Sequence, residues 1–337
     1  MTIRIAINGL GRIGRCLVRG IFEENYDNIE LVAVNGSAPI ETQIHLLKYD
    51  SIHGKFNAEV KAEGENQLSI NGKKIVLLNE RDPLKLNWKE LKIDLVMECT
   101  GAFTDLEGAK KHIQAGAKKV IISAPAKSDD VKTIVYGVND HILTTDDQVI
   151  SIGSCTTNCL APVAKILNDN LGIEKGFMTT IHSYTNDQNV VDNAHKDLRR
   201  ARACAMSMIP TSTGAAKALG LVLPELKGKL DGGSIRVPTP NVSVVDLNFL
   251  AKRNTSVEEI NEIMTKAAKS SKMSKVLQIV TDPLVSIDFN HNPYSSCFDS
   301  KLTKVLMGNM VKVFSWYDNE WGFSLRMLDV AGLFDAI

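Results

Sequence analysis

The sequence predicts an α/β chain of two domains, the first built on a parallel sheet and the second an α+β domain with a largely antiparallel sheet. Three observations support this prediction. The chain has 337 residues, and single hydrophobic cores seldom grow beyond about 250 residues. Short apolar runs alternate with helical patterns before residue 154. Longer β-rich runs follow that residue.

The first domain is predicted from strand-length apolar runs that are separated by amphipathic helices. Residues 29–34, 94–99 and 119–123 are mostly apolar. Residues 12–25 and 105–115 carry apolar side chains at helical spacing. Strands that alternate with helices form parallel sheets, because each crossover helix returns the chain to the same end of the sheet.

The second domain is predicted from longer strands and one covering helix. Residues 176–181, 234–237 and 242–247 form β-rich runs. Residues 257–270 have the apolar spacing of a helix that covers a sheet. Runs of strands with few helices between them favour an antiparallel arrangement.

The end of the chain is expected to return to the first domain. Residues 320–334 show helical apolar spacing that suits packing against it. We therefore expect a first domain of residues 1–154, completed by a C-terminal helix in 320–337. Residues 155–319 form the second domain in this interpretation.

The composition is that of an ordinary globular protein. Apolar residues make up 44% of the chain, charged residues make up 23%, and the formal net charge at pH 7 is zero. A neutral chain has no overall attraction to nucleic acids or anionic membranes. The basic run at 195–202 also lacks the aromatic residues that stack on bases. We expect neither nucleic-acid binding as the primary role nor association with a membrane.

The cysteines and the N-terminus indicate the compartment. Six cysteines are sparse and irregularly spaced, which predicts free thiols and no metal site. The chain begins with a strand-like segment, without a leader pattern, and it contains no apolar run of about 18 residues. We therefore expect a cytoplasmic protein.

A glycine motif follows the first predicted strand. Gly9, Gly11 and Gly14 form Gly-x-Gly-x-x-Gly where that strand gives way to a helix, which is the setting of a dinucleotide-binding turn. In such turns the first glycine permits the turn, the second lets the backbone approach a pyrophosphate, and the third lets the helix pack on the strand. The motif predicts a Rossmann-type domain that binds NAD or NADP.

The end of the second predicted strand bears on the choice between these cofactors. A carboxylate is expected there to bind the ribose 2′-hydroxyl of NAD, but this chain has Gly36 and Ser37. A carboxylate would repel a 2′-phosphate, whereas glycine leaves room for one and a serine hydroxyl can donate to it. We expect NADP to be accepted, and the preference between NADP and NAD is left open. The alternative is that NAD binds without a carboxylate at this position, with help from Glu41.

A cysteine lies where an apolar strand gives way to an amphipathic helix. Residues 151–159 read Ser-Ile-Gly-Ser-Cys-Thr-Thr-Asn-Cys, and a helix is predicted over 160–170. The free amides and the positive dipole end of a helix favour a thiolate, which is the attacking form of cysteine. Cys155 is therefore a candidate nucleophile, with a buried and inert thiol as the alternative. Cys159 is interpreted as a packing residue.

Short blocks of distinctive sequence are spread along nearly the whole chain. The most specific is Ser-Cys-Thr-Thr-Asn at 154–158. The others are 8–15, 48–54, 98–101, 122–125, 182–188, 213–217, 236–243 and 316–320. Together they resemble the phosphorylating glyceraldehyde-3-phosphate dehydrogenases. The resemblance implies reversible conversion of D-glyceraldehyde 3-phosphate to 1,3-bisphosphoglycerate with NAD or NADP, in glycolysis or gluconeogenesis, by a homotetramer.

The resemblance also implies roles for individual residues. Cys155 would attack the aldehyde to form a hemithioacetal and then a thioester, while His182 would serve as base and favour the thiolate. Phosphate-binding positions are implied for Ser154, Thr156, Thr185, Arg200, Thr213, Gly214 and Arg236. The choice among the arginines at 199–202 is left open. Cofactor positions beyond Gly9, Gly11, Gly14, Gly36 and Ser37 are implied for Arg12, Ile13, Arg81, Ser123 and Asn319.

Two other functions are retained as alternatives. An erythrose-4-phosphate dehydrogenase would share the glycine turn and the Cys/His pair, but residues 210–217 and 236–240 follow the pattern of the triose enzyme. A protein that uses this scaffold chiefly to bind RNA or a protein partner would be expected to lose its catalytic residues. Cys155, His182 and Arg236 are all present.

Overall fold

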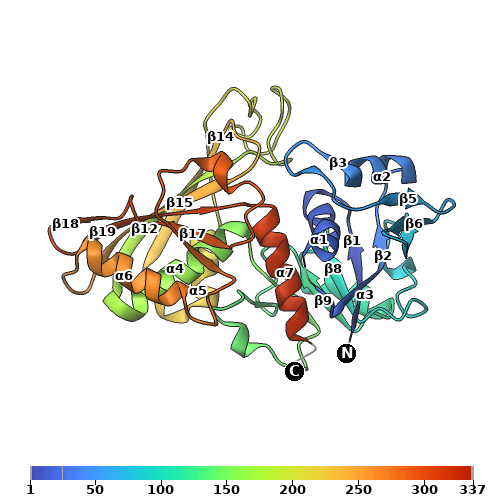
Figure 1. Cartoon of the computed structure of the whole chain (residues 1–337), viewed down its shortest axis with the longest axis horizontal. Coiled ribbons are helices and arrows are strands. Elements are labelled where there is room, and N and C mark those ends of the chain that lie inside the picture. Colours follow the sequence, from blue (N-terminus) through green and yellow to red (C-terminus); the bar gives the residue numbers. More distant parts are fainter. Residues whose placement is uncertain (1, 25, 335–337) are drawn as a thin grey trace. The chain divides into compact units, whose positions relative to one another are not determined.

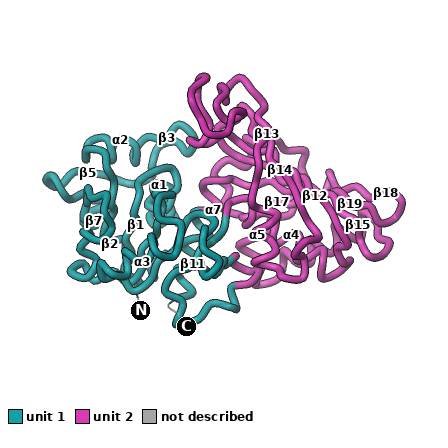
Figure 2. Tube along the Cα trace, turned by 180° about the vertical axis from the view of Figure 1, so that it is seen from behind, with its two compact units in different colours: residues 1–134, 140–153, 324–337 teal, residues 135–139, 154–323 magenta. Residues whose placement is uncertain are grey.

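The computed structural model describes residues 2–24 and 26–334, and the chain divides into two compact units. Unit 1 contains residues 1–134, 140–153 and 324–337, and unit 2 contains residues 135–139 and 154–323 (Figure 2). Each unit has a sheet and a hydrophobic core of its own.

Unit 1 is built on a sheet with the strand order β10-β11-β9-β8-β1-β2-β7-β6-β5. Neighbours from β10 to β7 are parallel, and β6 and β5 are added antiparallel at one edge. The strands are β1 (Ile3–Asn8), β2 (Ile29–Asn35), β5 (Val60–Ala62), β6 (Gln67–Ile70), β7 (Lys73–Leu78), β8 (Leu95–Glu98), β9 (Lys119–Ile122), β10 (Lys132–Thr133) and β11 (Val149–Ser151). A hairpin pairs β3 (Tyr49–Asp50) with β4 (Gly54–Lys55). The predicted parallel sheet is confirmed.

Helices of unit 1 connect these strands. They are α1 (Arg12–Glu23), α2 (Ile40–Lys48) and α3 (Leu106–Gln114), with 3₁₀ turns η1 (Pro83–Lys85) and η2 (Asp140–Ile142). The helix predicted over 12–25 ends at Glu23, and residue 25 lies outside the described residues. The helix predicted over 105–115 is observed as α3, with Asp105 and Ala115 as its two cap residues. The Asp105 carboxylate accepts from the Gly108 amide at 2.7 Å, which stabilises the start of the helix.

The C-terminal helix α7 (Trp321–Leu333) packs on α1 from Ser324 onward. A Cβ atom on Gly20 would lie 2.8 Å from Leu325 Cδ2, so the two helices meet at the glycine. The Tyr26 hydroxyl donates to the Leu325 carbonyl at 3.2 Å. Residues 335–337 of the helix predicted over 320–337 lie outside the described residues.

Unit 2 contains a mixed but mainly antiparallel sheet, in the order β13-β14-β12-β15-β19-β17-β16, with β18 beside β19. The parallel pairs are β12 with β14 and β16 with β17. The strands are β12 (Ile173–Ser183), β13 (Ile209–Thr211), β14 (Leu230–Val237), β15 (Ser243–Ala251), β16 (Leu277–Val280), β17 (Ser296–Asp299), β18 (Lys304–Leu306) and β19 (Met310–Tyr317). The predicted α+β architecture is confirmed.

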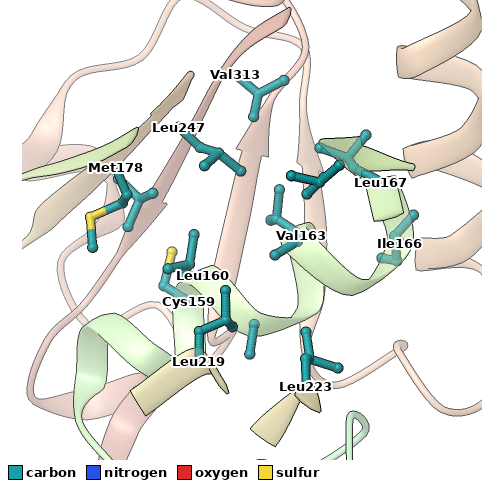
Figure 3. Close-up of a cluster of buried hydrophobic side chains, with 14 of the residues drawn as sticks. Cys159, Leu160, Val163, Ile166, Leu167, Met178, Leu219, Leu223, Leu247 and Val313 are labelled. Carbon is teal, nitrogen blue, oxygen red and sulfur yellow. The ribbon is translucent and has the colours of Figure 1, made fainter. Parts of the chain in front are cut away.

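Helices cover one face of this sheet (Figure 1). They are α4 (Cys155–Leu171), α5 (Ala215–Val222) and α6 (Val257–Ala268), with 3₁₀ turns η3 (Pro224–Leu226) and η4 (Ser286–Phe289). Apolar side chains from α4 and α5 meet apolar side chains from the strands (Figure 3). The labelled members are Cys159, Leu160, Val163, Ile166, Leu167 and Leu219 from the helices, Leu223 directly after α5, and Met178, Leu247 and Val313 from the strands.

A helix that spans a lipid bilayer needs about 20 mostly apolar residues. Among residues 2–24 and 26–334, no helix combines the length and the apolar composition that are needed to span one.

Candidate active site

Cys155 is the first residue of helix α4. The helix predicted over 160–170 therefore begins earlier than expected. Its start is fixed by Ser154, whose hydroxyl accepts from the Thr157 amide at 3.1 Å as an N-cap. Thr156 and Thr157 have modest helix propensity, but both are buried, so tertiary packing overrides that preference. The thiol lies in the first turn, where free amides and the helix dipole stabilise negative charge.

His182 stands opposite this thiol. Its Nε2 atom lies 3.5 Å from Cys155 Sγ. Alternation along β12 turns the side chains of Met178, Thr180 and His182 toward the covered face of the sheet. The imidazole is therefore buried, with 4% of its surface exposed. Sequence reasoning paired the two residues by resemblance, and the structure brings their reactive atoms together.

Arg236 adds a guanidinium group to the pair. Its Nη1 atom lies 2.8 Å from His182 Nδ1 and donates to the Ser183 carbonyl at 3.0 Å. His182 Nδ1 also lies 2.7 Å from that carbonyl. A guanidinium can only donate, so a bond from Arg236 to Nδ1 would need a lone pair there. The distances fit both neutral tautomers of the imidazole. With its hydrogen on Nε2, His182 accepts from Arg236 at Nδ1, and with its hydrogen on Nδ1 it donates to the Ser183 carbonyl and turns the Nε2 lone pair toward Cys155.

Burial and charge act differently on the two members of the pair. Burial raises the pKa of the Cys155 thiol, and the Arg236 cation opposes that rise. Burial and then Arg236 lower the pKa of His182 to about 3. The imidazole is therefore neutral at pH 7. We had expected His182 to favour the thiolate, but a neutral imidazole has no charge with which to do so, and Arg236 is the cation that acts to lower the pKa of the thiol. The role of His182 as the base stays a prediction.

Arg236 is also a cation without an anion. Its side chain is only partly exposed, and its Nε atom is buried without a hydrogen-bond partner. Within the described residues, no carboxylate lies within 4.0 Å of its nitrogens. A largely desolvated guanidinium in this condition is stabilised by a bound anion, and phosphate oxygens match its donors.

Tyr317 is a residue of this site that sequence reasoning missed. Its hydroxyl lies 2.8 Å from Thr156 Oγ1 and 2.9 Å from Thr180 Oγ1, and its ring meets His182 edge-on at 6.0 Å between ring centres. The buried Thr156 hydroxyl, expected at a phosphate position, is thus engaged with Tyr317. The alternation of buried residues along β19 is the sequence signal that could have placed Tyr317 inside.

The remaining phosphate candidates lie in and around the segment that leads into α5. Thr213 and Gly214 precede α5, and the Thr213 hydroxyl accepts from the Ala215 amide at 3.2 Å. A Cβ atom on Gly214 would meet nothing within 4 Å, so its backbone is open to a ligand. Arg200 donates to the Ser212 carbonyl at 3.3 Å, which anchors this segment.

Two of these candidates are held by neighbouring side chains. Arg200 pairs with the carboxylates of Asp187 and Asp197, so its charge is already balanced. The Thr185 hydroxyl donates to Gln188 Oε1 at 3.3 Å. The assignment of Arg200 and Thr185 to phosphate binding stays a prediction.

Asn319 is oriented by two hydroxyl groups. Its Oδ1 atom accepts from Ser183 Oγ at 2.8 Å and from Ser243 Oγ at 2.9 Å. This bonding leaves the Nδ2 hydrogens as the donors that remain, as binding of a nicotinamide carbonyl would require. Ser183 and Ser243 are positioning residues that sequence reasoning did not single out.

Unit 1 contains a cavity of about 550 Å³ around the glycine turn. Gly9 takes a φ of 103°, which favours glycine, and a Cβ atom on Gly14 would lie 1.9 Å from the Gly9 carbonyl oxygen. A Cβ atom on Gly11 would meet nothing within 4 Å. A tight turn, a close helix and an open backbone are what a dinucleotide pyrophosphate needs, so the cavity fits a nicotinamide dinucleotide.

The floor of this cavity is a network of buried polar side chains. Asn35 donates to Asn8 Oδ1 at 2.6 Å, and Asn8 donates to Glu98 Oε2 at 2.6 Å. Glu98 also accepts from the Thr100 amide at 2.8 Å. These residues close the ends of β1, β2 and β8 and hold the turn in shape. Sequence reasoning did not assign them this role.

The other cofactor candidates are spread around the turn. Gly36, Ser37 and Arg81 line the cavity together with Gly9 and Gly11. Arg12 and Ile13 are the first residues of α1, where their amides face the turn end of the helix. The Arg12 side chain is instead paired with Asp50. Ser123 directly follows β9, and its amide donates to the Glu98 carbonyl at 3.0 Å.

Asp50 keeps its charge in this pair with Arg12. Burial raises the pKa of the Asp50 carboxyl, but hydrogen bonds from Arg12 and from the amides of His53 and Ile52 outweigh burial and hold the pKa well below its usual range. The pair fixes the start of α1 to the segment that follows α2.

Comparison with known proteins agrees with this geometry. The model described as "Glyceraldehyde 3-phosphate dehydrogenase, NAD binding domain" matches residues 3–106, and the model described as "Glyceraldehyde 3-phosphate dehydrogenase, C-terminal domain" matches residues 154–319. The chain is 59% identical to glyceraldehyde-3-phosphate dehydrogenase of Xanthobacter flavus and 58% identical to that of Cereibacter sphaeroides, with 98% of each chain covered. It is 55% identical to glyceraldehyde-3-phosphate dehydrogenase 2 of Bacillus subtilis, over 98% of this chain and 96% of the relative.

The fold and these matches define a class, that of dehydrogenases with a Rossmann-type domain for a nicotinamide cofactor. Within that class, the chain belongs to the glyceraldehyde-3-phosphate dehydrogenase family. The resemblance inferred from the sequence is thereby confirmed.

Proposed function

We propose that this chain catalyses the reversible oxidative phosphorylation of D-glyceraldehyde 3-phosphate to 1,3-bisphosphoglycerate, with NAD or NADP as the hydride acceptor. The observation that carries the proposal is the Cys155 thiol at the start of α4, 3.5 Å from a neutral His182 imidazole. A nucleophile within reach of a base is what covalent aldehyde oxidation needs.

The chemistry assigned to the chain's residues runs in three steps. Cys155 adds to the aldehyde carbon through sulfur, which gives a hemithioacetal. His182 takes the proton of the hemithioacetal hydroxyl as the carbon–hydrogen bond breaks, and Cys155 then holds a thioester. A bound nicotinamide supplies the hydride acceptor for this step. Inorganic phosphate attacks the thioester carbonyl, and the sulfur leaves as the thiolate, which Arg236 stabilises.

Anion binding in unit 2 supports a phosphorylated substrate and a phosphate co-substrate. Arg236 offers a desolvated guanidinium without a carboxylate partner among the described residues. Thr213 and Gly214 add open donors before α5. Two phosphate groups require such donors at two positions, and we assign Arg236 to the group nearer the thiol.

We also propose that the chain works in the cytoplasm as a homotetramer. Phe177 is 69% exposed and faces away from the core that its neighbour Met178 enters. A hollow of about 420 Å³ beside it is lined largely by apolar side chains, including Leu250 and Met310. An apolar face of this kind is typical of a surface that another subunit covers.

The decisive experiment is a single turnover without phosphate. The natural chain, mixed with glyceraldehyde 3-phosphate and NAD, is expected to reduce one cofactor per subunit and then stop, because the thioester awaits an acceptor. Mass spectrometry is expected to find the acyl group on Cys155, and added phosphate is expected to restart turnover. Steady turnover that does not depend on phosphate would contradict the proposal.

The same assay compares cofactors and substrates. NADP in place of NAD tests cofactor choice directly. Erythrose 4-phosphate in place of the triose tests the alternative enzyme, and it is expected to give the lower kcat/KM because residues 210–217 follow the triose pattern. A higher kcat/KM for the erythrose substrate would favour the alternative.

A further inference from the structure

The nucleotide cavity of unit 1 is lined by the side-chain carboxamide of Gln43. Gln43 lies on α2 and lines the cavity with Gly36, Ser37 and Arg81. Only 4% of its surface is exposed. Its backbone amide donates to the Pro39 carbonyl, but its side-chain carboxamide has no hydrogen-bond partner among the described residues. The carboxamide lies on the wall of the cavity, and a polar group there that is not hydrogen-bonded within the protein is available to a ligand.

The position of this carboxamide identifies the part of the ligand that it faces. Gly36 directly follows β2, at the edge where Asn35 pairs with Asn8. In Rossmann-type domains an acid at this place binds the ribose 2′-hydroxyl. A Cβ atom on Gly36 would lie 2.5 Å from Gln43 Nε2 and 3.2 Å from Gln43 Cδ. Gln43 thus occupies the space in which the side chain of that acid would begin.

We propose that the Gln43 carboxamide binds the 2′ position of the adenosine ribose and is the residue that lets this chain accept both NAD and NADP. The inference rests on the proposed use of NAD or NADP. Gln43 takes the place of the missing acid from a different element, since it comes from helix α2 and not from the end of β2.

The chemistry of a carboxamide differs from that of a carboxylate at this point. A carboxylate only accepts hydrogen bonds, and it repels a phosphate. A carboxamide accepts through Oε1 and donates through Nε2, so it can bind a 2′-hydroxyl by either end and a 2′-phosphate through Nε2.

The charged side chains near Gln43 also favour its assignment to the 2′ position of the ribose. Arg81 lines the cavity, and among the described residues it has no ion-pair partner. Glu80 also lines the cavity, but its Oε1 atom accepts from the Asp82 amide at 2.8 Å. Glu41 is exposed and is not among the residues that line the cavity. The role that we had left open for Glu41 at the ribose therefore passes to Gln43.

The test measures binding of ligands that lack the nicotinamide, so that it does not depend on catalysis. ADP-ribose and 2′-phospho-ADP-ribose are titrated by calorimetry into the natural chain and into Gln43→Glu. This variant keeps the shape of the side chain and adds a negative charge. It is expected to lower the affinity for 2′-phospho-ADP-ribose at least about tenfold relative to the affinity for ADP-ribose. An affinity ratio within about twofold of the natural one would overturn the assignment of Gln43.

Two further variants separate this effect from others. Thr42→Glu adds the same charge at the neighbouring exposed position and is expected to leave the ratio unchanged. An equal shift in Thr42→Glu would mean that charge on α2 acts without contact, and it would overturn the assignment. Gln43→Leu removes both hydrogen-bonding ends at similar volume. It is expected to lower the affinity for ADP-ribose several-fold and to leave the affinity for 2′-deoxy-ADP-ribose unchanged. An equal loss of affinity for both ligands would contradict a contact at the 2′ position.

The outcome for the natural chain separates this inference from the proposed function. If neither ADP-ribose nor its 2′-phosphate binds the natural chain, the proposed use of NAD or NADP fails, and the role of Gln43 fails with it. If both bind and the Gln43 variants leave their ratio unchanged, the function stands and only Gln43 is excluded.

Discussion

Replacement of Cys155 by alanine is expected to lower the steady-state rate of aldehyde oxidation by more than about 10⁴-fold, because the covalent route loses its nucleophile. The rate of cofactor reduction with saturating aldehyde and phosphate measures this loss. Alanine is a good helix former, and the Ser154 cap that starts α4 does not depend on the thiol. Binding of ADP-ribose by the variant should therefore match that of the natural chain.

Cys159 provides the matched control on the same helix. It is fully buried, and its sulfur lies 3.6 Å from Ser296 Oγ and 3.6 Å from the Ser315 carbonyl. Burial raises the pKa of this thiol to about 12, so it holds no thiolate at neutral pH. Cys159→Ala is expected to keep its activity and to lose on the order of 1 kcal/mol of stability from the small cavity. Substantial turnover by Cys155→Ala, or loss of turnover in folded Cys159→Ala, would contradict the assignment of the nucleophile.

Replacement of His182 by asparagine has the second largest expected effect, a drop in kcat of about 10²- to 10⁴-fold. Asparagine can retain a hydrogen bond to the Ser183 carbonyl, but it cannot accept a proton from Cys155 or from the hemithioacetal. Alkylation of Cys155 by iodoacetamide at pH 7 should also slow, because Nε2 no longer takes the thiol proton. The two rates are measured on the same preparation, and an unchanged kcat would remove His182 as the base.

The pH dependence of stability gives this variant a second readout. The pKa of His182 is lowered from 6.5 to about 3 by burial and by Arg236. Between these values the unfolded chain binds a proton at this residue and the folded chain does not. Stability contributed at neutral pH is therefore lost as the pH falls through this window, by up to about 1.4 kcal/mol per unit. The natural chain should lose stability faster on acidification than His182→Asn, and equal slopes in denaturant titrations would contradict a neutral buried imidazole.

Much of the fold was predictable because it depends on local patterns. Apolar runs and helical spacing indicated β2, β8 and β9 with the helices between them, since these periods follow from backbone geometry alone. The start of α4 was not predictable in this way. Thr156, Thr157 and Asn158 disfavour a helix when considered by themselves, and only their burial in unit 2 keeps them helical.

The residues of the candidate site also differ in whether local sequence patterns could identify them. Cys155 and His182 were identified from short motifs, because each lies in a block whose residue order is itself distinctive. Tyr317 and Gln43 were missed. Tyr317 meets Thr156 from a strand that lies far along the chain, and Gln43 faces Gly36 across a turn. Neither carries a local sequence signal of a contact with its partner.

The sequence by itself determined the family, the two kinds of sheet, the glycine turn and the candidate nucleophile, because each is encoded in neighbouring residues whose spacing or order is informative. The tertiary structure decided which charges meet. Arg236 and the burial around β12 keep His182 neutral, and Asp187 and Asp197 occupy Arg200. Gln43 covers the position of a missing acid. Electrostatics and solvation depend on distances between residues far apart in the chain, and only folding sets those distances.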